Sequence, residues 1–378
     1  MKKAFLSLFL ALSLLCIPAL SVRAIDESAV SAPSAVLMEP ATGKILYEKN
    51  SHEPRPCASI TKVMTLLLVF EALDSGKLRL DDVITASAHA ASMGGSDIWL
   101  EEGESMSADD MIKATVVASA NDAAVALAEH LSGSEDAFVE QMNRRAKELG
   151  MADTVFKNCN GLDEEGHITS AYDVALMSRE LMKYPKIYDY TSIWLDYLRD
   201  GKTQIVNTNK LLKTYNGITG LKTGTTDDAG CCMAASACRD GMNMLSVVLG
   251  CDNGKQRFAD AAALLDYGFA DFAIKELKLP EDFPQSVAVN DGMTDSVPIS
   301  CTVDSFMLID KSSADEPVCA VDLPESVEAP VEEGEVVGSL TYSLGGEQKH
   351  FDVVADEAVE KTSFGLIFGR LFHSLIAL

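Results

Sequence analysis

The sequence predicts an α+β fold with mixed helices and strands, followed by a small all-β sandwich domain and a C-terminal amphipathic helix. Helical and strand patterns are interleaved over residues 25–273. Short alternating runs, interrupted by Pro and Gly, fill residues 274–360, and apolar residues recur at helical spacing in residues 361–378. A chain of 378 residues is long enough for two domains.

Residues 1–24 are typical of a secretory signal peptide. Lys2 and Lys3 precede an apolar stretch over residues 4–20, and Val22-Arg23-Ala24 is similar to a small-residue cleavage site. An uncleaved membrane anchor is the alternative interpretation. We therefore expect an exported, extracytoplasmic protein.

The composition excludes several classes of function. The net charge is −26, so the chain lacks the basic surface that a nucleic-acid partner requires. Hydrophobic residues at 47% and charged residues at 23% are ordinary globular values, which argues against a disordered chain. The six histidines and nine cysteines show no zinc-ligand spacing, so we expect neither a metal nor another cofactor.

Two strands and a series of helices are expected first in the 25–273 region. Residues 34–49 predict two strands joined by a turn at 40–43. A helix over 59–73 has apolar residues at helical spacing and Gly76 just beyond its end. Further helices are predicted over 107–118, 120–131 and 134–149, and their candidate N-caps are Ser107, Ser119 and Ser134.

Strand patterns predominate from residue 217 onward. The β-prone runs are 221–226, 231–238 and 244–249, and Arg239-Asp240-Gly241 signals a turn between the last two. A closing helix is predicted over 259–272. The acidic region that follows, with the alternating run 338–344 before Gly345-Gly346, predicts the all-β domain.

Ser59-Ile60-Thr61-Lys62 is the first motif that carries chemistry. Residues three apart on a helix share one face, so Ser59 and Lys62 can meet. A serine hydroxyl needs an adjacent base to act as a nucleophile, and a partly desolvated lysine can lose its proton and serve as that base. A capping serine followed by a surface lysine is the alternative when this motif is taken alone.

Two weaker motifs follow along the chain. In Ser119-Ala120-Asn121, Ser119 could relay protons to the leaving amine, and Asn121 could hold a peptide carbonyl and orient Lys62. In Lys222-Thr223-Gly224, Lys222 and Thr223 could recognise a carboxylate from a strand edge. A glycine at 224 would allow substrate and strand to approach closely. Each motif alone is also compatible with an ordinary helix cap or strand end.

The order Ser-x-x-Lys, Ser-x-Asn, Lys-Thr-Gly is similar to the motif set of penicillin-binding proteins and class A β-lactamases. The surrounding sequence resembles the D-alanyl-D-alanine carboxypeptidases, which are low-molecular-mass penicillin-binding proteins, and most closely their sporulation-type members from Gram-positive bacteria. This resemblance implies a penicillin-binding/β-lactamase-like serine transpeptidase domain, with an antiparallel sheet, flanking helices and a helical subdomain. The segments that carry it are 58–65, 93–96, 119–123, 160–163, 166–173 and 220–226.

The resemblance also implies an activity. A serine-type DD-carboxypeptidase removes the terminal D-alanine from peptidoglycan stem pentapeptides through an acyl-enzyme, here on Ser59, and β-lactam antibiotics are its covalent inhibitors. By analogy, the backbone N–H groups of Ser59 and Thr225 form the oxyanion hole. Residues 207–209 stand where some relatives carry a carboxylate-binding arginine, so we expect substrate recognition to depend on Lys222 and Thr223.

Two other functions remain as alternatives. A β-lactamase would share the three motifs, but class A enzymes carry a deacylating glutamate about 35 residues after the second motif, and residues 155–160 contain no acid. The β-rich domain has no place in that class either. A non-catalytic cell-wall-binding protein would leave the intact motifs unexplained.

The C-terminal residues 361–378 predict a membrane-anchor helix. Phe364, Phe368 and Leu371 belong to an apolar series at helical spacing, whereas Arg370 and His373 interrupt the run. Eighteen residues reach roughly 27 Å as a helix, slightly less than a bilayer core. We therefore expect a helix that lies in the outer face of the cytoplasmic membrane rather than one that spans it. A terminal helix docked on the β-domain is the alternative.

Overall fold

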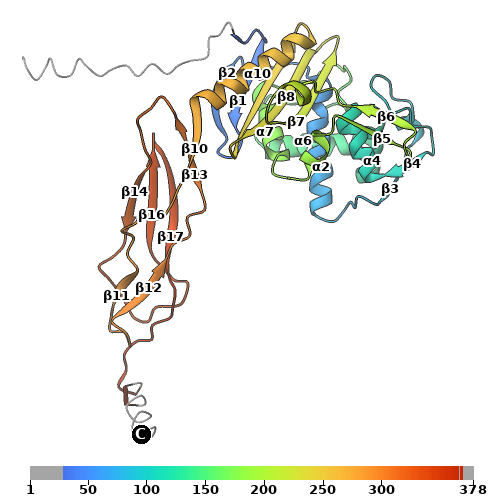
Figure 1. The fold of residues 1–378 in the computed structure, drawn as a ribbon. Helices are drawn as coiled ribbons and strands as arrows, with labels where there is room; N and C mark the ends of the chain where they lie inside the picture. The colour runs from blue at the N-terminus through green and yellow to red at the C-terminus, as the bar shows by residue number, and fades with distance from the viewer. Residues whose placement is uncertain (1–28, 366, 369–378) are drawn as a thin grey trace, which may run out of the picture. The chain divides into compact units, whose positions relative to one another are not determined.

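The computed structural model describes residues 29–365 and 367–368 (Figure 1). The predicted signal peptide at 1–24 and most of the predicted anchor helix at 361–378 therefore lie outside the described residues. Within the described chain, one compact unit ends at Asp271 and a second begins at Phe272. None of the helices in these described ranges combines the length and the apolar character that a membrane crossing requires.

A five-stranded antiparallel sheet forms the centre of the first unit. Its strand order is β2-β1-β9-β8-β7, and every neighbouring pair is antiparallel. The strands are β1 (Ser34–Glu39), β2 (Lys44–Lys49), β7 (Ile218–Thr226), β8 (Gly230–Arg239) and β9 (Met242–Cys251). All five strands predicted from the sequence are confirmed, and β7, β8 and β9 extend beyond the predicted runs.

Helices cover both faces of this sheet. Helix α10 (Gly254–Asp271) packs closely on one face, where a Cβ at Gly268 would lie 2.9 Å from the sulfur of Met244 and 3.1 Å from Leu37. Alternate side chains of β1 point the other way, and Val36 and Met38 join the core that contains α2 (Lys62–Asp74) and α7 (Ala171–Leu181). The predicted closing helix is confirmed and begins five residues earlier than expected.

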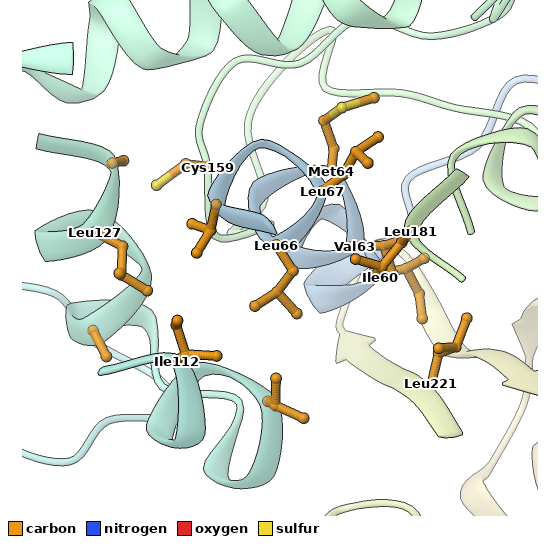
Figure 2. Packing of buried hydrophobic residues seen from close by; sticks show 14 of the residues in the cluster. Ile60, Val63, Met64, Leu66, Leu67, Ile112, Leu127, Cys159, Leu181 and Leu221 are labelled. Atoms are coloured by element: carbon orange, nitrogen blue, oxygen red, sulfur yellow. The ribbon is translucent and has the colours of Figure 1, made fainter. Parts of the chain in front are cut away.

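Helix α2 is buried around most of its circumference, because it lies between the sheet and a helical subdomain. In Figure 2, Val63 and Ile60 lie near Leu181 and Leu221, whereas Leu66 points towards the helices that carry Ile112 and Leu127. The main helices of the subdomain are α4 (Ala108–Lys113), α5 (Asn121–Ser132) and α6 (Glu135–Glu148), with a single π-helical turn, η3 (Ala114–Ala118), between α4 and α5.

The predicted caps were right at two of three positions. The side chains of Ser107 and Ser134 accept hydrogen bonds from the backbone N–H groups of Asp110 and Ala137. Ser119 is not a cap, because its backbone is left-handed (φ 62°) and its hydroxyl is used elsewhere.

Eight elements were not predicted. Seven of them contain only three to five residues of mixed composition, whereas α7 has 11 residues. The four strands among them form two separate two-stranded sheets, outside the five-stranded sheet. The elements missed are β3 (Val83–Thr85), α3 (Ala88–Ala91), β4 (Ser105–Ser107), α7, α8 (Ile187–Thr191), β5 (Leu195–Leu198), β6 (Thr203–Val206) and α9 (Leu211–Thr214).

From residue 274 to residue 360 the second unit is all-β, as predicted (Figure 1). Strand β10 (Phe272–Glu276) pairs with β13 (Phe306–Asp310), and six further strands form a sheet of order β14-β16-β17-β12-β11-β15. Val297, Leu340 and Val353 are fully buried in its core. The six strands are β11 (Ser286–Asn290), β12 (Ser296–Ser300), β14 (Val318–Asp322), β15 (Ser326–Glu328), β16 (Val336–Leu344) and β17 (Glu347–Ala355).

Candidate active site

The predicted nucleophile, Ser59, lies in a short 3-10 turn, η2 (Ala58–Thr61), immediately before α2. The sequence predicted one continuous helix from Ser59, but only Lys62 onward is α-helical. Ala58 has a positive φ of 50°, a backbone conformation that costs roughly 1–3 kcal/mol in a residue with a Cβ. This turn leaves Ser59 partly exposed while Lys62, one turn further on, is completely buried.

Lys62 uses all of its donors inside the protein. Its Nζ lies 3.0 Å from Ser59 Oγ, 2.5 Å from Asn121 Oδ1 and 2.6 Å from the carbonyl oxygen of Asn160. Burial lowers the pKa of Lys62 from 10.5 to about 7. A large fraction of the amine is therefore neutral at pH 7, with a lone pair that can accept the proton of Ser59.

Ser119 lies at the end of the π-helical turn, and its hydroxyl accepts a hydrogen bond of 2.7 Å from Nζ of Lys222. Single π-turns inside helices are frequent at functional sites. Asn121 begins α5, and its side chain is fixed at both ends: Oδ1 accepts from Lys62, and Nδ2 donates to the Gly94 carbonyl at 2.6 Å. The π-turn therefore directs the Ser119 and Asn121 side chains to two different lysines.

Strand β7 carries the third motif, Lys222-Thr223-Gly224, and places it beside Ser119. Lys222 is 2% exposed, and its pKa lies well below the usual value because of burial and then because of the positive charges of Lys62 and Arg257. The hydroxyl of Thr223 lies 2.6 Å from that of Thr208. Lys222 is thus held between strand β7 and the hydroxyl of Ser119.

Gly224 is needed for a close approach between two backbones. A Cβ at this position would lie 2.6 Å from the carbonyl oxygen of Cys57 and 2.9 Å from the backbone nitrogen of Ser59. The sequence led us to expect that the missing side chain leaves room for substrate. The structure gives a different reason: without a Cβ, β7 can lie directly against the turn that carries Ser59, which brings the backbone of Gly224 beside that of Ser59.

Arg257, on α10, is a site residue that the sequence analysis missed. It is 8% exposed, and its Nη1 donates to the Gly224 carbonyl and to Thr225 Oγ1, both at 2.9 Å. Its Nε is buried and has no hydrogen-bond partner among the described residues. Nothing in the local sequence singles out this arginine, because only the fold brings α10 to the end of β7. Asn207 and Asn209, at the position where an arginine was considered, bind backbone carbonyls instead.

All eight predicted site residues therefore lie at one site, to which the structure adds Arg257 and the carbonyl of Asn160. Two serine–lysine pairs, Ser59–Lys62 and Ser119–Lys222, are brought together beside a strand edge that approaches the nucleophile closely. This mixed fold with its three motifs defines the class of active-site serine enzymes that contains the penicillin-binding proteins and the class A β-lactamases.

Comparisons with known proteins narrow the class to a family. Residues 21–253 match the model of peptidase family S11, D-alanyl-D-alanine carboxypeptidase, and residues 278–361 match the C-terminal domain of penicillin-binding protein 5. The D-alanyl-D-alanine carboxypeptidase DacF of Bacillus subtilis is 42% identical, over 90% of this chain and 88% of its own length. The chain belongs to the D-alanyl-D-alanine carboxypeptidase family and is a serine-type carboxypeptidase.

Solved structures agree with this assignment. A peptidoglycan synthesis regulatory factor (PBP3) from Streptococcus pneumoniae is similar with a TM-score of 0.75 and 32% identity, over 88% of this chain and all of its own. Penicillin-binding protein D2 from Listeria monocytogenes, solved in an ampicillin-bound form, is similar with a TM-score of 0.58 and 33% identity, over 64% of this chain and 98% of its own. The resemblance stated from the motifs is thus confirmed, as is the expected fold class.

Proposed function

We propose that this site removes the terminal D-alanine from peptidoglycan stem pentapeptides through an acyl-enzyme on Ser59. The observation that carries the proposal is the position of Lys62, which lies 3.0 Å from the Ser59 hydroxyl and has a pKa lowered by burial to about 7. A neutral amine at this distance is a suitable general base for a serine nucleophile.

The protons can be followed through both halves of the reaction. Lys62 takes the proton of Ser59 as Oγ attacks the D-Ala–D-Ala carbonyl. The Ser119 hydroxyl, hydrogen-bonded to Lys222, delivers a proton to the nitrogen of the departing D-alanine. Lys62 returns its proton to replace the one that Ser119 gave up, so the amine of Lys62 is neutral again before deacylation. Water then attacks the ester, Lys62 accepts a proton from that water, and Lys62 passes this proton to Ser59 Oγ as the bond to the acyl carbon breaks. The backbone N–H groups of Ser59 and Thr225 stabilise the oxyanion in each half.

Substrate recognition is assigned to the cations around β7. The terminal carboxylate of the substrate would be bound by Lys222 and the Thr223 hydroxyl, and Arg257 adds a second positive group beside Thr225. Asn121 Nδ2 donates one N–H to Gly94, and its second N–H would donate to a peptide carbonyl of the stem. β-Lactam antibiotics would acylate Ser59 by the same route, and the ampicillin-bound Listeria relative supports this part of the proposal.

Two assays on purified protein test the proposal. Wild-type enzyme should release D-alanine from diacetyl-Lys-D-Ala-D-Ala and form a covalent adduct with a fluorescent penicillin. Ser59→Ala should lose both activities by at least about a thousandfold, because it removes the hydroxyl that lies 3.0 Å from the proposed base, Lys62. Adduct formation that survives in the Ser59→Ala protein would show that the nucleophile is a different residue.

We also propose export and peripheral attachment to the outer face of the cytoplasmic membrane. The assignment is a signal peptide at 1–24, a catalytic domain at 25–273, a β-rich domain at 274–360 and an anchor at 361–378. The unit boundary at Asp271 supports the division. Phe364, Ile367 and Phe368 are exposed, and the rings of Phe364 and Phe368 stack with centroids 6.0 Å apart, which places them on one side of the chain.

Flotation with phospholipid vesicles tests the attachment. Protein that begins at residue 25 should float with the vesicles, whereas the same chain ending at Glu360 should remain at the bottom and keep full activity on small peptides. A matched full-length variant with Phe364→Ser and Phe368→Ser should lose flotation to a similar extent. Equal partitioning of the full-length and truncated chains would exclude the anchor.

A further inference from the structure

The loop formed by residues 157–167 lies directly over the amine of Lys62. The Asn160 carbonyl accepts the hydrogen bond of 2.6 Å from Lys62 Nζ, and the Cys159 carbonyl accepts one of 2.5 Å from Thr65, one turn further along α2. At Gly161 the loop touches the turn that carries Ser59, because a Cβ there would lie 2.0 Å from the carbonyl oxygen of Ala58. The burial of Lys62 therefore depends on a loop almost 100 residues away in sequence, a separation of 98.

One imidazole ties this loop to the nucleophile turn. Nδ1 of His167 accepts a hydrogen bond of 3.2 Å from the backbone nitrogen of Lys157, so the two ends of the loop are joined. Nε2 of His167 lies 2.8 Å from Oγ1 of Thr61, the residue directly before Lys62. Because Nδ1 is an acceptor, the neutral ring carries its hydrogen on Nε2 and donates it to Thr61.

The surroundings of His167 keep the ring neutral. His167 is 5% exposed, and its ring meets the edge of Phe156 with centroids 5.8 Å apart. Burial lowers the pKa of His167 to about 4; the charges of Glu164 and Asp163 oppose this effect and that of Lys157 adds to it. At neutral pH the imidazole can therefore accept from one end of the loop and donate to Thr61 at the same time, which a charged imidazolium could not do.

We propose that His167 is a positioning residue for the catalytic lysine: by joining Lys157 to Thr61, it keeps the 157–167 loop closed over Lys62. The inference rests on the proposed role of Lys62 as the base. With the loop closed, the amine is dry and is held by the Asn160 carbonyl. With the loop open, water reaches the amine, its protonated form is favoured, and less of the base is available at neutral pH.

The pH dependence of acylation tests this role. In wild-type protein, the rate of acylation by a fluorescent penicillin should rise with pH through a midpoint near 7, where Lys62 loses its proton. His167→Ala should move the midpoint upward. The rate should therefore fall at least about tenfold at pH 7 but only a few-fold at pH 10, where even a solvated lysine is partly neutral.

Matched variants separate positioning from simple destabilisation. His167→Gln can accept from Lys157 through Oε1 and donate to Thr61 through Nε2, so it should restore the midpoint to near 7. His52→Ala removes an exposed histidine and should change nothing, and Met142→Ala should lower the melting temperature without moving the midpoint. If His167→Ala does not fold, His167→Leu fills the volume without either hydrogen bond and replaces it.

The possible results distinguish this inference from the proposed function. If the acylation rate of the wild type does not rise with a midpoint near pH 7, Lys62 is not the base, and the proposed function is contradicted as well. If the wild-type profile has its midpoint near pH 7 and the midpoint is the same in His167→Ala or His167→Leu, the positioning role alone is overturned. A loss of rate by the same factor at every pH is one form of this result.

Discussion

Replacing Lys62 with methionine should stabilise the catalytic unit below pH 7 and destabilise it above pH 10. The lysine pKa is about 7 in the folded protein and 10.5 in the unfolded chain, so the unfolded state binds more protons between these values. Stability of the wild type therefore rises with pH across this window. Below pH 7 the buried lysine is charged, and its full cost to the folding free energy is the difference between the two pKa values times 1.36 kcal/mol, which is about 5 kcal/mol.

The hydrogen bonds that Lys62→Met removes lower the stability of the variant at every pH. Methionine leaves the Asn121 oxygen and the Asn160 carbonyl without their buried donor, which costs roughly 1–1.5 kcal/mol for each of these acceptors. Lys62→Met should consequently be more stable than wild type by about 2 kcal/mol at pH 6 and less stable by about 2 kcal/mol at pH 10. The variant should form no penicillin adduct at either pH.

Urea unfolding followed by tryptophan fluorescence measures this difference. Trp99 and Trp194 are the only two tryptophans in the chain, and both belong to the first unit, so the signal reports the unit that contains Lys62. Lys113→Met, at a mostly buried lysine paired with Asp196, is a suitable control because its pKa is raised and its contribution should not reverse sign between pH 6 and pH 10. A difference between Lys62→Met and wild type that stays constant from pH 6 to pH 10 would refute the assignment of a neutral, buried base.

Three further substitutions follow from the geometry of β7. Lys222→Ala should lower kcat/KM by about 10- to 100-fold on a peptide with a free terminal carboxylate but only slightly on its C-terminal amide, and an equal loss on both substrates would contradict a carboxylate role. Gly224→Ala should slow acylation by about 100-fold, because its Cβ would meet Cys57 and the Ser59 nitrogen, and a normal rate of adduct formation would mean that this contact is not needed. Arg257→Met should raise KM for the carboxylate substrate about tenfold while melting curves remain close to wild type, and an unchanged KM would remove Arg257 from the binding site.

The elements predicted well from the sequence are those whose own residues determine them. The runs at 221–226, 231–238 and 244–249 are β-prone and end in turn signals, and they form the buried strands β7, β8 and β9. Ser107 and Ser134 cap helices because an N-cap depends only on the next three residues. The order of the three motifs was also sufficient to indicate the family, since each motif is a local pattern.

The properties that give the site its chemistry could not be predicted, because they arise from contacts between distant segments. From sequence, Lys62 is one lysine near a helix start, and its burial comes from Asn121 and Asn160, which lie 59 and 98 residues away. Ser119 has the composition of a cap, but a π-turn rotates its hydroxyl towards Lys222. Arg257 reaches β7 only because α10 folds back over the sheet.

The site concentrates positive charge in a strongly acidic protein. Lys62, Lys222 and Arg257 are all buried, and within the described chain no carboxylate forms a hydrogen bond or an ion pair with any of them. Each of the three pKa values is lowered first by burial, and the pKa of Lys222 is lowered further by its two cationic neighbours. Paired carboxylates would stabilise this arrangement, but they would also hold Lys62 in its charged form and occupy the place of the substrate carboxylate. In the mechanism that we propose, the substrate brings the missing negative charge, as its terminal carboxylate on binding and as the oxyanion during reaction. On this proposal, the cost of burying three cations without a paired carboxylate is the physical origin of both the free base and the preference for an anionic peptide end.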